Sequence, residues 1–317
     1  MNLGNFAHLH LLLNHVPTVG TVIGIGLLLL ALVRRNDHLK HASLEVFFLV
    51  ALLTLPAYLT GVAAQSYIQD RPEVTQLAMD AHHNAALLAF VLMQLTGAIA
   101  WFALWQFRRR TTPPPWAVSA VLLMSVLTMA VMAGAATLGG EIRHPEIRIE
   151  GAPEEVGTMA GLEWLSRAGI QGTVTEYPWV WPAAETVHFL GLCLTFGILL
   201  VVNLRLLGSM TGIPFAALHR LLPWGMLGLG VNLATGMLFF IGTPEQYTTN
   251  IPFYWKMGFL MAAGANLLYL TVVDRAWSLQ SGQNAHVVDK AVAASAIVLW
   301  LGVIYWGRML PFIGNAF

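Results

Sequence analysis

The chain has 317 residues, of which 57% are hydrophobic and only 10% are charged. A soluble domain carries about 25% charged residues, so this composition excludes an ordinary soluble protein and indicates a lipid bilayer as the surroundings. The 16 basic and 16 acidic residues balance, which argues against a nucleic-acid partner. The single Cys193 excludes an internal disulfide, a Cys-x-x-Cys-His haem attachment site and a cysteine-ligated iron–sulfur cluster.

Apolar runs along the chain predict the fold class. Crossing the hydrocarbon core takes roughly 20 residues of helix. Eight runs are long enough, at 11–33, 44–65, 84–107, 116–138, 183–207, 217–241, 255–273 and 290–310. Pro56 and Pro223 fall inside the second and sixth of them. We expect an all-α integral membrane protein whose eight transmembrane helices form two fused four-helix bundles.

Charged residues in the connecting loops give the expected orientation. Lys and Arg gather after spans one, three, five and seven, whereas most acidic residues lie in the other loops. The positive-inside rule therefore predicts that both termini lie outside the cytoplasm. The N-terminus lacks the basic start of a cleavable signal peptide, so its apolar run is expected to remain as a span. The expected location is the bacterial inner (cytoplasmic) membrane.

A long hydrophilic connection divides the chain. We expect a first four-helix membrane unit over 1–139, an extracytoplasmic connecting segment over 140–181 and a second four-helix unit over 182–317. Within the connecting segment a short helix is expected around 156–167. The segment is acidic, and connections of this length are usually functional or disordered.

The two halves look like distant repeats. Thr60-Gly61 lies near the end of the second span, and Thr235-Gly236 lies near the end of the sixth. At nearly the same distance further on, the pair His82-His83 corresponds to Trp255-Lys256. The halves are therefore expected to carry related but non-equivalent sites.

Histidine is the exception to the scarcity of polar residues, with eleven in the chain. Ionisable groups within a membrane are functional candidates by default. Depth counted from the inner arginines gives five candidates near the outer face: His15, His82, His83, His144 and His188. The remaining six are expected to be solvated, in or beside loops: His8, His10, His38, His41, His219 and His286.

Histidines at one depth on different helices are typical of a b-type haem, whose iron takes two axial imidazoles from the core of a helix bundle. The first expected pair is His15 with His83, and His82 is the competing choice. Arg143 is expected to pair with the haem propionates. The competing cofactor is copper or zinc, held by His8, His10 and His15 or by His82, His83 and His144.

The second half offers a different ligand set. His188 is the candidate iron ligand there, so that a second haem or copper stays open as a cofactor. Lys256 would contact a haem propionate, ligate iron if deprotonated, or simply extend to water. Glu185, one helical turn before His188, would orient its imidazole, accept protons or remain solvated at the helix start.

The first half resembles the DUF2231-like group of four-span bacterial membrane proteins, whose function is poorly defined. The resemblance rests on short motifs: His10 to Pro17 (His-Leu-Leu-Leu-Asn-His-Val-Pro), Thr60-Gly61-Val-Ala-Ala64, the pair His82-His83, and Gly139-Gly140-Glu-Ile-Arg-His144.

Residues 178–275 look like another uncharacterised membrane family, weakly similar to the copper-resistance CopD-type proteins and the membrane-embedded protoporphyrinogen oxidases. The matching residues are Glu185-Thr-Val-His188-Phe-Leu-Gly191, Asn203-Leu-Arg205-Leu-Leu-Gly208 and Lys256. This resemblance implies a redox role for His188 and Lys256. Tyr269 stands where a second histidine would follow Lys256, which puts oxidase activity in doubt.

These observations favour a membrane-bound b-type cytochrome subunit that transfers electrons near the outer, periplasmic face through a bis-histidine haem. Its partners would be a periplasmic redox protein such as a cytochrome c, and a quinone or a sister subunit of an oxidoreductase complex. One alternative is a copper-handling or other metal-handling membrane protein or transporter. The other is a cofactor-free membrane anchor subunit.

Overall fold

The computed structural model describes residues 6–69, 71–72, 74–107, 113–143 and 163–313. The ordered elements among these residues are all helices, without a β-strand. Seven of the described helical segments are long and apolar enough to cross a membrane. The protein is therefore a multi-pass membrane protein, as its composition predicts. The chain forms two compact units, Met1–Thr173 and Val174–Phe317, called unit 1 and unit 2 below.

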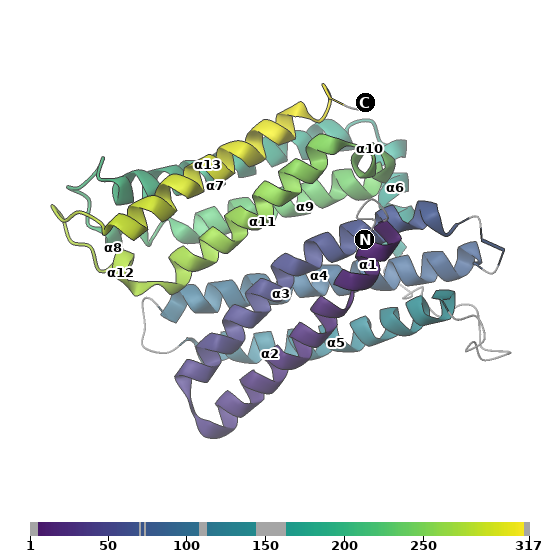
Figure 1. Cartoon of the computed structure of the whole chain (residues 1–317), viewed down its shortest axis with the longest axis horizontal. Coiled ribbons are helices and arrows are strands. Elements are labelled where there is room, and N and C mark those ends of the chain that lie inside the picture. The colour runs from purple at the N-terminus through teal and green to yellow at the C-terminus, as the bar shows by residue number, and fades with distance from the viewer. Residues whose placement is uncertain (1–5, 70, 73, 108–112, 144–162, 314–317) are drawn as a thin grey trace. The chain divides into compact units, whose positions relative to one another are not determined.

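The described part of unit 1 contains four long helices, which run alongside one another in Figure 1. Helix α2 packs on α3, α3 on α4, α4 on α5, and α5 on α2, so the four enclose one core. The short α1 leads directly into α2 and leans on α3. The elements are α1 (Phe6–Leu13), α2 (His15–Arg34), α3 (Asp37–Ala64), η1 (Gln65–Tyr67), α4 (Gln76–Phe107), α5 (Pro115–Arg143), η3 (Glu163–Leu165) and the start of α6 (Arg167–Glu176).

Small residues let the helices of unit 1 approach closely. A Cβ added to Gly97 on α4 would lie 2.2 Å from the Cβ of Ala51 on α3. A Cβ on Gly24 of α2 would lie 2.7 Å from the ring of Phe47, which is fully buried. Such small-residue contacts are the usual means of packing helices in lipid, where no hydrophobic force drives helices together.

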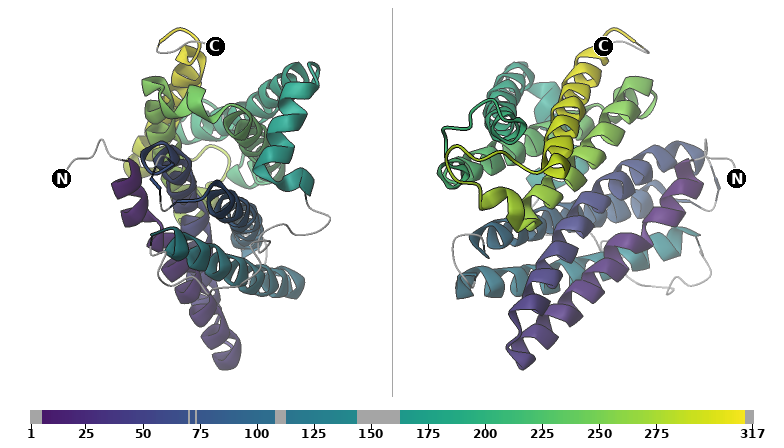
Figure 2. Two further views of the ribbon diagram at one scale, coloured as in Figure 1. Left: turned by 90° about the vertical axis from the view of Figure 1, so that its right-hand side faces the viewer. Right: turned by 60° about the vertical axis from the view of Figure 1, so that its left-hand side comes forward.

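Unit 2 is also built from four long helices, seen from two further directions in Figure 2. Helix α7 packs on α9 and on α13, and α13 packs on α11. The elements are α7 (Val180–Leu207), α8 (Phe215–Leu218), α9 (Leu222–Gly242), α10 (Pro244–Thr248), α11 (Ile251–Val272), α12 (Asp274–Trp277) and α13 (Val287–Met309).

Three details differ from the sequence-based expectations. The sixth apolar helix starts at Leu222 rather than near 217, so Pro223 lies in its first turn, where a missing N–H is tolerated. The predicted crossing at 255–273 corresponds to α11, which is not among the seven apolar crossings of the described residues. Of the short helix expected at 156–167, residues 156–162 lie outside the described residues. The remaining part contains η3 (Glu163–Leu165), and α6 begins at Arg167.

Arg205, near the end of α7, fixes one end of unit 2. Its side chain is fully buried. Its Nε donates to the Ile213 carbonyl at 2.5 Å, Nη1 to that of Gln283 at 3.1 Å and Nη2 to that of Gln280 at 3.0 Å. One guanidinium therefore joins the connection after α7 to the connection before α13.

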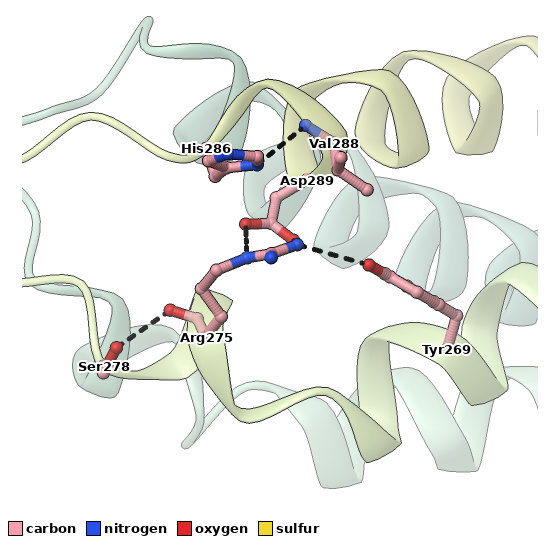
Figure 3. A network of polar contacts seen from close by, with 6 residues as sticks. All are labelled: Tyr269, Arg275, Ser278, His286, Val288 and Asp289. Carbon is pink, nitrogen blue, oxygen red and sulfur yellow. Dashed lines mark hydrogen bonds and ion pairs between the residues drawn. The ribbon is translucent and has the colours of Figure 1, made fainter.

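A second polar network at this end joins the last two long helices (Figure 3). The Arg275 guanidinium donates to both carboxylate oxygens of Asp289, at 2.8 and 2.9 Å, and to the Tyr269 hydroxyl at 3.5 Å. Asp289 is buried in the first turn of α13, where its charge suits the positive end of the helix dipole. The His286 ring caps the same helix by accepting from Val288 N–H. These contacts set where α13 begins.

The α7–α9 contact in unit 2 allows a direct test. A Cβ on Gly228 would lie 2.5 Å from the Thr195 hydroxyl and 2.8 Å from the Gly191 carbonyl oxygen. Because one of these obstacles is backbone, Gly228→Ala is expected to lower the free energy of unfolding by about 1–3 kcal/mol. Unfolding of the detergent-solubilised protein by increasing SDS measures it. Gly230→Ala on the same helix, where a Cβ meets open space, is the control and should unfold like the wild type. Equal effects of the two would contradict this packing.

Candidate functional site

The first half of the candidate site starts with His10 on α1. Its Nδ1 lies 2.9 Å from the carbonyl oxygen of Ala57 on α3. A carbonyl can only accept, so Nδ1 carries the proton, and the neutral ring keeps its lone pair on Nε2. Gly61, one turn further along α3, makes room for the ring, because a Cβ there would lie 2.8 Å from His10 Cε1.

His82 on α4 repeats this arrangement against α5. Its Nδ1 lies 2.9 Å from the carbonyl oxygen of Ala135. Gly139 follows one turn later, and a Cβ on it would lie 3.0 Å from His82 Cε1. The same reasoning places the proton on Nδ1 and leaves the Nε2 lone pair available. Two histidines on different helices therefore have the same tautomer, and each ring lies against a carbonyl oxygen and a glycine of the neighbouring helix.

His83 has the opposite tautomer. Arg167, the first residue of α6, places Nη1 3.1 Å from His83 Nδ1 and 2.5 Å from Gln65 Oε1. A guanidinium only donates, so His83 Nδ1 accepts and the proton of the neutral ring lies on Nε2. The backbone N–H of Arg167 also donates to Asn84 Oδ1 at 3.1 Å. Arg167 thus connects the start of α6 to the starts of α4 and η1 and uses the Nδ1 of His83 as a hydrogen-bond acceptor.

These side chains form one group at the end of unit 1 where α3 finishes and α4 starts. The His82 and His83 ring centroids are 6.2 Å apart, and both rings are within electrostatic range of His10. Asn14 adds a buried Oδ1 that has no hydrogen-bond partner among the described residues. The group therefore combines unprotonated imidazole nitrogens, the guanidinium of Arg167 and the unsatisfied Asn14 Oδ1.

The other residues predicted for unit 1 lie elsewhere. His15 is exposed and makes no hydrogen bond or ion pair with a described residue. Five residues along a helix correspond to a rotation of about 140° beyond a full turn, so His10 and His15 cannot both face α3. Arg143 ends α5, but its side chain lies outside the described part of the structure, as does the whole of His144.

The sequence analysis did not assign His10 to the haem: it expected this residue to be solvated, or to hold copper or zinc together with His8 and His15. Helical spacing could have found it. His10, Asn14 and Pro17 recur at intervals of four and three residues, and Pro17 is buried. The backbone runs helically through Asn14, whose N–H donates to the His10 carbonyl at 2.8 Å. The inward face of α2 therefore continues into α1.

In unit 2 the corresponding histidine is His188 on α7. Its Nδ1 lies 2.7 Å from the hydroxyl of Thr235 on α9. That hydroxyl gives its only hydrogen to the Val231 carbonyl, at 2.7 Å, so it accepts from His188 Nδ1 and leaves Nε2 unprotonated. Gly236 lies beside the ring, with a Cβ position 3.8 Å from His188 Cε1.

Lys256 on α11 completes the polar group in unit 2. Its Nζ would lie 3.6 Å from a Cβ on Gly307 of α13, and its charge is within electrostatic range of His188. No described residue gives Lys256 a hydrogen bond or an ion pair. The neighbouring Trp255 stacks on Trp306, with ring centroids 5.8 Å apart. Lys256 thus has no counter-ion among the described residues, although it lies on a long and mostly apolar helix.

Tyr247 on α10 lies within electrostatic range of Glu185 on α7. Burial, with a smaller contribution from the negative charge of Glu185, raises the pKa of the Tyr247 phenol. The hydroxyl therefore stays protonated at any physiological pH. Glu185 itself is exposed on α7, three residues before His188.

The two units follow one plan, which extends the repeat predicted from sequence. In each, a histidine of the first helix lies against a glycine of the second, and a basic side chain of the third lies against a glycine of the fourth. The four pairs are His10 with Gly61, His82 with Gly139, His188 with Gly236, and Lys256 with Gly307. Thr60 and Thr235 also share a back-bond to the carbonyl four residues earlier, each at 2.7 Å.

Comparison of the chain with family models, curated proteins and solved structures finds no match. Among the described residues, no three His, Cys, Asp or Glu side chains form a group that could hold a metal ion. The copper or zinc set that includes His144 extends beyond these residues.

Proposed function

We propose that unit 1 holds a b-type haem whose axial ligands are His10 and His82, and that the chain is the haem-bearing subunit of a membrane redox complex. One observation supports this most directly: both imidazoles donate Nδ1–H to a backbone carbonyl, at 2.9 Å each. Histidines that ligate metals almost always donate their other N–H in this way, which orients the ring and makes the ligating nitrogen more basic.

This ligand pair differs from the pair expected from sequence. His15 is exposed, and Arg167 occupies the Nδ1 of His83, so that His83 presents a protonated Nε2. His82, the competing choice in the sequence analysis, presents a lone pair. His10 takes the place that was assigned to His15, on the opposite side of the same apolar crossing.

The surroundings of the imidazoles suit the remaining needs of a haem. Arg167 is held by Gln65 and His83 and retains further N–H groups, so it is our candidate partner for a propionate. Tyr58 packs on Phe90, with centroids 4.9 Å apart, and provides an aromatic wall between α3 and α4. Gly61 and Gly139 leave space beside the rings. A bound haem would supply one-electron transfer, and the residues named here would hold and orient it.

We further propose that the chain crosses the membrane eight times with both termini outside. Helix α11 has 22 residues and would span about 33 Å, which matches a hydrocarbon core of about 30 Å. The Lys256–Gly307 contact places the start of α11 beside the end of α13, as two successive antiparallel crossings require. The positive-inside rule then puts both polar groups on the periplasmic side of a bacterial inner membrane.

In this position the chain would exchange electrons with a periplasmic redox protein, such as a cytochrome c, and with a quinone or a sister subunit. The test of the haem is the visible spectrum of the purified protein, produced with haem in excess. We expect the α band of a b-type cytochrome after reduction with dithionite. A folded protein without this band would overturn the proposal. Bound copper in such a colourless protein would favour metal handling, and the absence of both would favour an anchor subunit.

A further inference from the structure

The polar group of unit 2 presents hydrogen-bonding atoms that the chain does not satisfy. His188 Nε2 is an acceptor, because the proton of the neutral ring is on Nδ1, which donates to Thr235. Asn232, three residues before Thr235 on α9, has a buried Oδ1 without a hydrogen-bond partner among the described residues. Lys256 Nζ is a donor without an acceptor there. Leaving the buried Asn232 Oδ1 unpaired is costly, and the half-buried His188 and Lys256 side chains lie beside it with hydrogen-bonding capacity to spare. These atoms therefore point to a ligand.

The three atoms lie in one part of unit 2. Gly191 follows His188 by one turn, and a Cβ on it would lie 2.9 Å from Asn232 Nδ2. His188 and Asn232 therefore lie about a turn apart along the same α7–α9 contact. Lys256 approaches from α11, within electrostatic range of His188. One turn before Asn232 on α9, at Gly228, the two helices leave no space between them, because a Cβ on Gly228 would lie 2.8 Å from the Gly191 carbonyl oxygen.

The balance of donors and acceptors restricts the ligand. It must donate a hydrogen bond, because His188 Nε2 and Asn232 Oδ1 only accept, and it must accept one from Lys256. A lipid phosphate offers acceptors alone and would leave both acceptors unsatisfied. A hydroxyl group on a lipid-soluble molecule provides both functions. An aromatic diol also suits the neighbouring Trp255 and Trp306 rings, which stack at 5.8 Å.

We propose that this group of residues binds the headgroup of a quinol. One quinol hydroxyl donates to His188 Nε2 and accepts from the Lys256 ammonium. The other quinol hydroxyl donates to Asn232 Oδ1. The assignment deepens the proposed function, on which it rests for its redox meaning, by naming the quinol as the lipid-soluble partner and unit 2 as its site. It also explains why unit 2 has a lysine where unit 1 has a histidine.

The test is equilibrium dialysis of a short-chain hydroquinone against the detergent-solubilised full chain under anaerobic conditions, with the visible spectrum recorded on the same samples. Wild-type protein should bind the hydroquinone about tenfold more tightly than the corresponding quinone, which lacks the donors. Lys256→Met and His188→Phe should each weaken hydroquinone binding by a similar factor. Lys256→Met removes an uncompensated charge and is expected to fold.

The control is Lys290→Met, since Lys290 lies near the start of α13, far from Gly307 along the same helix. It should bind the hydroquinone like the wild type. Unchanged affinity in Lys256→Met and His188→Phe, or loss of haem absorbance in Lys256→Met, would overturn the quinol site. A coloured protein without hydroquinone binding would leave the haem proposal standing, and a colourless protein that binds would leave the quinol site standing.

Discussion

His82→Ala, and independently His10→Ala, is expected to yield a folded protein whose haem occupancy falls below about a tenth of the wild-type value. The single cysteine rules out a two-thioether attachment, so the haem depends on its axial ligands to stay bound during purification. Each variant removes one lone pair that the other side chains of the group do not replace. The measurement is the dithionite-reduced α band per mole of protein, with folding checked by size-exclusion chromatography in detergent.

Two matched variants make this prediction specific. His15→Ala changes an exposed ring five residues from His10, and His83→Ala changes a ring adjacent to His82 whose Nδ1 accepts from Arg167. Both should keep the band, and His83→Ala should alter only its position or potential. If His15→Ala and His83→Ala lose the band while His10→Ala and His82→Ala retain it, the iron ligands are the pair expected from sequence depth.

The fold was accessible from the sequence because lipid imposes a simple rule. Every backbone polar group must be satisfied within the membrane, so an apolar run of sufficient length is a helix. Seven of the eight predicted spans correspond to described helices that are long and apolar enough to cross a membrane. The eighth fell short in hydropathy because α11 carries Lys256 and Asn266. The proposal that α11 also crosses the membrane therefore rests on its length and on its packing against α13.

The candidate site was accessible only in part. The motifs Thr60-Gly61 and Gly139-Gly140 stood out in the sequence through the repeat and the family resemblance, neither of which gave their glycines a role. The structure gives two of their glycines a more specific place, beside the rings of His10 and His82. Depth counting placed His82 and His83 at the same level of the membrane and could not separate them. Their difference lies in the partner of each Nδ1, a carbonyl for one and a guanidinium for the other.

The sequence placed Arg205 among the basic residues after span five and in the motif Asn203-Leu-Arg205-Leu-Leu-Gly208, without a structural role for its side chain. Positive-inside counting treats such a residue as an exposed charge, whereas the structure buries it completely. Its three carbonyl partners come from connections that are distant in sequence. The same connections are joined by Gly282 N–H to the Thr211 carbonyl, at 2.8 Å, and by Phe215 N–H to that of Leu279, at 3.0 Å. Contacts of this kind depend on loop conformation, which has no periodic signature.

Arg205→Met is therefore expected to lower the free energy of unfolding by about 4 kcal/mol. Each carbonyl that loses a charged donor in a buried place costs about 1–3 kcal/mol, and the three losses are not additive. Arg205→Lys should recover only part of this stability, because an ammonium on a flexible stem does not reproduce the planar fork that meets three acceptors. Unfolding of the detergent-solubilised protein by increasing SDS measures both variants.

Arg220→Met is the matched control, since Arg220 is exposed in the turn between α8 and α9 and lies close to the same connections. It should unfold like the wild type. Hydrogen exchange adds a local reading: in Arg205→Met the amides of Phe215 and Gly282, which bond across the two connections, should exchange faster than in Arg220→Met. If both variants unfold alike and exchange alike, the buried guanidinium of Arg205 does not hold this end of unit 2 together. The ion pair between Arg275 and Asp289 would then be the main polar link to α13.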